Sequence, residues 1–169
     1  MGKYGNLNIR ELKKFQELLQ KLQDPDAFVE ACAKELAARL LAKVIKRTPV
    51  GDYSKPVQFT TKDGKDVNFQ PNTGKKGGTL RRGWTGEKRA DATNYANSLP
   101  VEHTGTVYKI NIVNPVEYAA YVEYGHRTAN HKGWVKGQFM MTISENELRS
   151  IAPKVLEQKI KKYLQEVMK

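Results

Sequence analysis

The amino-acid sequence predicts an α+β fold, in which a small antiparallel sheet packs against a long helix in the N-terminal half and a helix at the C-terminus. Three patterns predict this class. Residues 25–48 carry two adjacent apolar rows at helical spacing. The middle of the chain alternates apolar and polar residues around turn signals, as half-buried strands do. Residues 144–169 then return to helical spacing, so helices precede and follow the sheet.

The first predicted element is a helical arm at residues 1–24, in front of a single α+β domain at residues 25–169. Asn8 and Glu11 have the spacing of an N-cap and its N3 partner. The residues that follow place one apolar stripe on a helix, made of Leu12, Phe15, Leu19 and Leu22.

The second element is the main core helix. Asp24-Pro25 predicts its start, because Asp is a good N-cap and proline suits the first helical position. Pro49 predicts its end near Thr48, since a residue before proline avoids the helical region. Its apolar positions form two i,i+4 rows, which are Phe28, Cys32, Leu36, Leu40 and Val44, and Val29, Ala33, Ala37, Leu41 and Ile45.

Two hairpins are predicted in the middle of the chain. Val57–Phe59 and Val67–Phe69 alternate around Asp63-Gly64, which is typical of a two-residue turn. This hairpin lies in an insertion at residues 51–78, which also contains a glycine-rich basic loop. Residues 101–103 and 106–113 predict a second hairpin, turned at Thr104-Gly105. Residues 80–84 fit a short helix or a strand, and the pattern leaves both open.

The C-terminal part begins with a break at Asn114-Pro115, followed by a short helical turn that Gly125 ends. Residues 133–141 fit a returning strand. Ser144 and Glu147 have the spacing of a capping box and predict the start of the last helix. Pro153 then lies in the first turn of that helix or kinks it.

Composition excludes several classes of protein. The longest apolar stretch is interrupted by Arg39 and Lys43, so no segment reaches the roughly 20 apolar residues that cross a bilayer. Residues 1–10 have no apolar region of a signal peptide. A single cysteine, Cys32, excludes an internal disulfide. We therefore expect a soluble protein made in a reducing cytoplasm.

No catalytic, cofactor-binding or metal-binding constellation is found, and we expect no enzyme and no cofactor. Cys32 lies on the apolar row of the core helix, where cysteine acts as a small hydrophobe. His126 and His131 straddle a polar loop, and their spacing differs from that of two ligands on one helix face. A metal-dependent hydrolase that uses these two histidines stays open as a minor alternative.

Charge is the strongest compositional feature. The chain has 29 Lys and Arg against 18 Asp and Glu, a formal net charge of +11, which favours an anionic neighbour. One segment concentrates it around Trp84, and cations interleaved with an aromatic suit nucleic-acid contact. A basic nucleic-acid-binding module is therefore the alternative function. The candidate residues of this basic segment, facing DNA or a neighbouring ring, are Lys75, Lys76, Arg81, Arg82, Trp84, Lys88 and Arg89.

Large aromatic residues crowd into residues 118–139. A small domain has little room to bury all of them, and Tyr and Trp are favoured where one side packs and the other meets a partner. This region is the candidate subunit interface, with the residues Tyr118, Tyr121, Glu123, Tyr124, Trp134 and Phe139.

The order of several motifs resembles one protein family. The motifs are Thr48-Pro49-Val50, residues 78–82 (Gly-Thr-Leu-Arg-Arg), the strand at residues 107–113, the block Tyr-Ala-Ala-Tyr-Val-Glu-Tyr-Gly at residues 118–125, and Phe139-Met140 before the last helix. Together they resemble the minor tail-component, or neck, family of long-tailed bacteriophages and prophages. In that family the Thr-Pro-Val turn runs almost directly into the Leu-Arg motif, whereas residues 51–77 intervene here.

The resemblance implies a structural virion protein that completes the tail or joins it to the head. Such proteins assemble as a ring around the DNA channel, with six subunits as the expected number. The implied partners are further copies of the chain, neighbouring neck, connector, tail-tube or terminator proteins, and genomic DNA that passes without its sequence being read. The virion is the implied location, and no membrane is involved. Tail terminator, head–tail adaptor and adjacent neck subunit all remain open.

Overall fold

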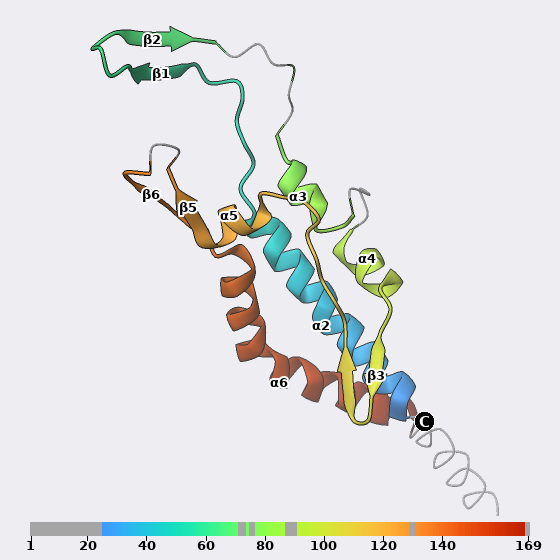
Figure 1. Ribbon diagram of the computed structural model, residues 1–169. Coiled ribbons are helices and arrows are strands. Elements are labelled where there is room, and N and C mark those ends of the chain that lie inside the picture. Colours follow the sequence, from blue (N-terminus) through green and yellow to red (C-terminus); the bar gives the residue numbers. More distant parts are fainter. Residues whose placement is uncertain (1–24, 71–73, 75–76, 87–90, 129–130, 168–169) are drawn as a thin grey trace, which may run out of the picture.

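The computed structural model in Figure 1 describes residues 25–70, 74, 77–86, 91–128 and 131–167. The arm expected at residues 1–24 lies outside the described residues. The α+β class is confirmed. Two long helices, α2 (Pro25–Arg47) and α6 (Met140–Val167), pack together. The shorter helices are α3 (Thr79–Gly83), α4 (Ala92–Ser98) and α5 (Ala119–Tyr124).

The strands of the described residues pair as three separate antiparallel hairpins. The inserted hairpin is β1 (Val57–Thr60) with β2 (Asp66–Phe69), and the second is β3 (Glu102–Thr104) with β4 (Val107–Lys109). The third is β5 (Gly125–Arg127) with β6 (Trp134–Lys136), where residues 133–141 predicted a strand. Each hairpin lies at the periphery in Figure 1, so the helices supply most of the core.

Helix α2 is the centre of the core. Within the described residues it runs from Pro25 to Arg47, so its end lies beside the predicted boundary at Thr48, whereas the predicted N-cap Asp24 lies outside the described residues. Its fully buried positions fall on one stripe that includes Leu41 and Val44, at 0% exposure. Its solvent side carries the ion pairs Glu30–Lys34 at 2.9 Å and Glu35–Arg39 at 2.8 Å. Among the described residues, the remaining buried apolar members of the core cluster come from α3 and the residue after it, from α4 and from α6: Leu80, Trp84, Ala96 and Met140.

The end of α2 is closed by a buried threonine. Thr48 has 0% exposure, and its hydroxyl donates to the Val44 carbonyl at 2.6 Å. The hydroxyl also accepts the Trp84 Nε1–H at 2.8 Å, and the Thr48 carbonyl accepts Nε and Nη2 of Arg81 at 3.1 and 2.7 Å. Arginine is a favourable partner for helix-terminal carbonyls. Of residues 80–84, for which the sequence left helix and strand open, residues 80–83 are helical in α3, and Trp84 follows the end of that helix.

The turn of the inserted hairpin differs from the prediction. Asp63-Gly64 predicts a two-residue turn with positive φ at both residues, but only Gly64 has it, at φ 74. The Thr61 N–H donates to the Lys65 carbonyl at 2.8 Å, and the Gly64 N–H donates to the Thr61 carbonyl at 3.0 Å. The connection therefore has three residues, because a turn without left-handed Asp63 needs one further residue to match the strand twist.

The capping box predicted at Ser144 and Glu147 is wrong. Helix α6 already begins at Met140, so Ser144 is inside it. The buried Ser144 hydroxyl donates to the Met140 carbonyl at 2.6 Å, and Glu147 binds Lys43 and Arg47 of α2. A side chain from another part of the chain caps this helix, and a local pattern gives no sign of it.

Pro153 lies inside α6, which changes direction in its middle in Figure 1. Proline lacks an N–H and clashes with the preceding turn, which bends a helix. Both halves of α6 consequently contact α2. Glu147 binds α2 from the first half, and the Lys159 ammonium donates to the Ala31 carbonyl at 2.8 Å from the second. The rings of Phe28 and Tyr163 lie 4.5 Å apart between centroids.

Candidate subunit interface

The block at residues 118–125 forms α5 and the glycine that follows it. At its end the chain crosses the segment that precedes α6, and the backbones of the two segments contact each other. At the end of α5, the Val122 and Glu123 carbonyls accept the N–H groups of Gln138 at 2.7 Å and Phe139 at 3.0 Å. Gly125 follows with φ 87, as predicted for a helix stop. These bonds satisfy carbonyls that a helix end leaves without partners.

The crossing depends on two glycines. A Cβ atom on Gly125 would lie 2.4 Å from the Val135 carbonyl oxygen, and one on Gly137 would lie 2.2 Å from the Glu123 carbonyl oxygen. Side chains cannot occupy either position without moving the backbone. Residues 123–125 and 135–137 are therefore in direct main-chain contact, and hairpin β5–β6 continues from that contact.

Glu123 is the acidic member of this block, and it points inward. Its exposed fraction is 6%, and its carboxylate accepts the N–H of Met141 at 2.9 Å and of Thr142 at 3.0 Å. The Thr142 hydroxyl donates to the same carboxylate at 2.8 Å. The first N–H groups of a helix lack internal partners and carry partial positive charge, which a carboxylate stabilises. Glu123 thus serves as the N-terminal cap of α6.

The aromatic members of the block point the other way. Tyr118, Tyr121, Tyr124 and Trp134 are 46%, 60%, 64% and 63% exposed, whereas Phe139 is half-buried. The Tyr121 ring meets the His126 ring edge-on at 5.8 Å between centroids. The structure therefore gathers these aromatics at the surface of α5 and β5–β6, and Glu123 lies beneath them as part of the framework. The aromatic patch is defined here as Tyr118, Tyr121, Tyr124 and Trp134.

The basic segment is divided by the structure. Trp84 is 5% exposed in the core, and Arg81 is bound to Thr48, so neither presents its polar group freely at the surface. Arg82 is exposed and donates to the Gly77 carbonyl at 3.2 Å. Lys75, Lys76, Lys88 and Arg89 lie outside the described residues. Reasoning from the sequence missed the structural role of Arg81 and Trp84, although their i,i+3 spacing permits a shared helix face.

The remaining candidates are the two histidines and the single cysteine. No cluster of three or more His, Cys, Asp or Glu side chains that could hold a metal occurs in the described part of the chain. His126 is partly buried, while His131 lies in the loop between β5 and β6. Cys32 is 7% exposed, and burial raises the pKa of its thiol, which disfavours the reactive thiolate.

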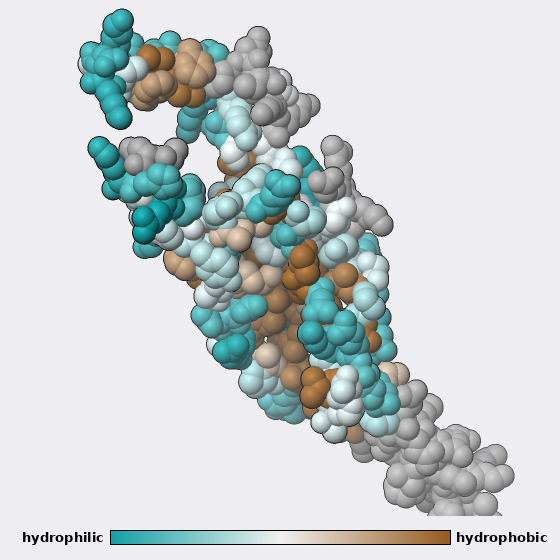
Figure 2. Space-filling model, in the orientation of Figure 1, coloured by the Kyte–Doolittle hydropathy of each residue, from teal (hydrophilic) through white to brown (hydrophobic). Residues whose placement is uncertain are grey.

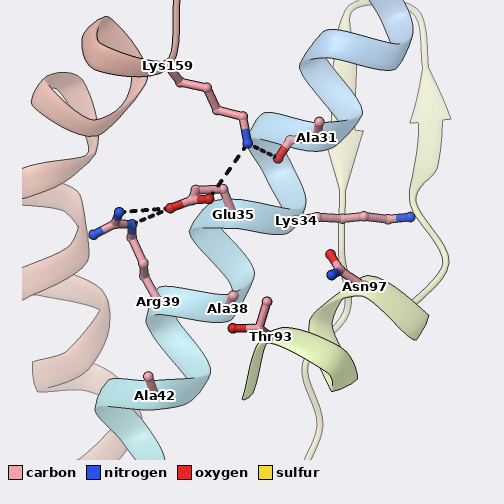
Figure 3. Close-up of a pocket in the computed structure, with 9 residues that line it drawn as sticks. All are labelled: Ala31, Lys34, Glu35, Ala38, Arg39, Ala42, Thr93, Asn97 and Lys159. Atoms are coloured by element: carbon pink, nitrogen blue, oxygen red, sulfur yellow. Dashed lines mark hydrogen bonds and ion pairs between the residues drawn. The ribbon is translucent and has the colours of Figure 1, made fainter. Parts of the chain in front are cut away.

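Figure 3 shows a groove between α2, α4 and α6, in which Arg39 and Lys159 both bind Glu35. Glu35 accepts from Arg39 and lies 3.7 Å from the Lys159 ammonium, and Lys159 also binds the Ala31 carbonyl. Of these contacts, those of Lys159 connect α6 to α2. None of the helices in the described ranges combines the length and the apolar character that crossing a bilayer requires.

Comparison with known families identifies the chain. Residues 12–125, more than half of the sequence, match the HK97-gp10-like family, described as a bacteriophage HK97-gp10 tail component. No curated protein and no solved structure matches the sequence significantly. The matched range includes the core helix, α3 and the whole of the 118–125 block. The chain therefore belongs to this bacteriophage tail-component family.

Proposed function

From membership of this tail-component family, we propose that the chain is a subunit of a ring in the neck or tail of a phage or prophage. The ring completes the tail or joins it to the head. The observation that carries this proposal is the aromatic patch, whose four large side chains are between 46% and 64% exposed. Exposed Tyr and Trp side chains are typical of protein interfaces.

The framework beneath the patch supports an assembly role. The backbone that carries Tyr121 and Tyr124 is fixed by the Glu123 cap and by the contact of Gly125 with residues 135–137. Contacts made by rigid side chains lose less conformational entropy on binding than contacts made by mobile ones. The backbone that carries these two tyrosines is consequently in place before a partner binds.

The implied partners follow from the same proposal. A ring requires two different surfaces on each subunit, and the aromatic patch is one of them. Neighbouring neck, connector, tail-tube or terminator proteins meet the faces of the ring. The net charge of +11 suits acidic neighbours and the phosphates of DNA that passes through the channel unread.

A double variant, Tyr124→Ser with Trp134→Ser, tests the proposal. Both side chains are exposed, so folding is retained, whereas we expect the variant to be depleted from purified virions or tail particles. Val107→Ser is the matched control, because Val107 is 62% exposed on β4, outside the patch. Light scattering of the wild-type chain, alone and in particles, gives the number of copies. A wild-type chain that is monomeric and missing from particles contradicts the proposal.

A further inference from the structure

The inserted hairpin carries an apolar face that nothing in the described residues covers. Val57 pairs with Phe69 and Phe59 with Val67, so these four side chains share one face. Val57, Phe59 and Phe69 are 38%, 52% and 49% exposed. Figure 2 shows apolar side chains gathered on this projecting hairpin. A two-stranded hairpin alone is marginally stable in water, which favours a covered face in the assembled state.

The root of this hairpin, where the two segments that connect it to the rest of the chain meet, holds the hairpin away from the body. A Cβ atom on Gly77 would lie 2.0 Å from the Gly51 carbonyl oxygen, so the two connecting segments touch where the insertion begins and ends. Arg82 donates to the Gly77 carbonyl at the same place. In Figure 1 the hairpin projects beyond α3 and is separated from the helices. The part of the body that the structure describes therefore leaves the apolar face uncovered.

The charge of the hairpin favours a basic or neutral partner over nucleic acid. Residues 51–70 contain three Lys and three Asp, so they are neutral, and the net charge of +11 resides in the rest of the chain. A neutral apolar surface gains nothing from phosphates, but it can approach another basic copy of this chain without charge repulsion.

A groove of matching character lies on the body. Its volume is about 250 Å³, and its mostly apolar wall is formed by Trp84 just after α3, the 112–114 segment, α5 and the start of α6. Pockets for small molecules usually measure about 300–1,000 Å³, so this groove suits a few side chains of a partner. Val113 at its rim is 68% exposed, and Tyr124 belongs to both the groove and the aromatic patch.

We propose that Phe59 and Phe69 of one subunit occupy this groove on the next copy of the chain. The inference rests on the proposed ring and names its second surface, since the hairpin and the groove differ and each subunit offers both. Such heterologous contacts close into a ring when the rotation between subunits permits. The area of the hairpin face is small compared with the roughly 1,200–2,000 Å² that a standard protein interface buries. The hairpin therefore acts together with the adjoining aromatic patch.

Disulfide cross-linking tests the contact. Val57→Cys and Val113→Cys are made separately and then mixed, in solution at high concentration and in particles, under mild oxidation. A disulfide dimer is expected only in the mixture, because one cysteine lies on the hairpin face and the other at the groove. Gln58→Cys mixed with Val113→Cys is the matched control, since Gln58 points to the opposite face of β1. Cys32 stays in place because it is buried.

The outcomes separate the two proposals. Assembled particles without this cross-link, or with equal cross-linking of the Gln58→Cys control, overturn the hairpin contact and leave the ring intact. A wild-type chain that never assembles overturns both. As a second measurement, Phe59→Ser with Phe69→Ser is expected to lower the assembled fraction about tenfold or more, as loss of aromatic anchors does. Gln58→Ser with Asn68→Ser should assemble normally, and equal losses in both pairs count against the proposal.

Discussion

At the scale of single residues, the carboxylate of Glu123 joins two elements that have no visible connection in the sequence. Residues 139 and 140 are Phe and Met, which offer no side-chain oxygen to the first N–H groups of α6. Glu123 supplies that oxygen from α5. The residue that the sequence places among interface candidates is therefore a tertiary helix cap, and the aromatics around it keep the exposed positions.

Glu123→Ala tests this cap. The variant removes three hydrogen bonds to a buried carboxylate and leaves two helix N–H groups without partners. The expected loss in the free energy of unfolding is about 2–3 kcal/mol. Urea denaturation measures it, with Glu117→Ala as the control because Glu117 is exposed on the same segment. A loss no greater than that of the control would show that the cap contributes nothing to stability.

Glu147 gives a prediction on pH. Hydrogen bonds from Lys43, and then from Arg47, lower the pKa of this carboxyl below its ordinary value. Because this pKa is lower in the folded state than in the unfolded state, ionised Glu147 stabilises the folded protein at pH values above the ordinary Glu pKa of about 4.3. This contribution to stability is lost as the pH falls through the lower pKa of the folded state. Glu147→Gln should therefore lower the urea midpoint at pH 7. The difference in midpoint between wild type and variant should become smaller below about pH 4.

The control for this titration is Glu145→Gln, because Glu145 is exposed two residues before Glu147 and points to another side of α6, away from Lys43 and Arg47. The pKa of Asp52 is also lowered, first by its hydrogen bond from the Ser54 hydroxyl, so its titration contributes to the pH dependence of both proteins. Only the difference between wild type and Glu147→Gln is therefore informative. A difference that persists unchanged at pH 3 would contradict the role given to ionised Glu147.

At the scale of elements, the predictable parts are those with local signals. Helix α2 could be predicted because its apolar rows, Pro25 and Pro49 all act within the segment itself. The start of α6 could not, because the Ser144–Glu147 pattern is equally compatible with a helix interior. The aromatic region could be predicted as a surface cluster from composition. The inward turn of Glu123 and the burial of Trp84 depend on tertiary contacts that no local pattern encodes.

The crossing of α5 and the segment before α6 is tested by Gly137→Ala. The added Cβ would lie 2.2 Å from the Glu123 carbonyl oxygen and 2.6 Å from the Tyr124 carbonyl carbon, so backbone must move. Overpacking of this kind costs about 1–3 kcal/mol. Gly133→Ala in the same hairpin is the control, because its nearest atom is a Thr128 side-chain carbon at 3.3 Å. Thermal unfolding with equal midpoints for the two variants would contradict the crossing.

At the scale of the whole molecule, the insertion at residues 51–77 lies outside the core, whose contacts are formed by the residues before and after it. Thr48 and Arg81 are bound to each other although residues 51–77 separate their motifs, and Gly51 meets Gly77 at the root. The sequence shows an interruption between two motifs, whereas the fold brings these motifs back together. This arrangement locates the neutral hairpin outside a body that carries the positive charge.

Deletion of residues 52–76, with Gly51 joined to Gly77 through two added glycines, tests this organisation. The Thr48–Arg81–Trp84 contacts and the buried core lie outside the deleted range, so the variant should fold with an almost unchanged free energy of unfolding. Its helical circular dichroism should persist, because no helix of the described residues lies between 52 and 76.

Assembly should be lost, since the variant keeps the groove but lacks the hairpin that fills it. A deletion variant that cannot fold would show that the insertion belongs to the core, and one that assembles normally would show that the hairpin is dispensable for the ring.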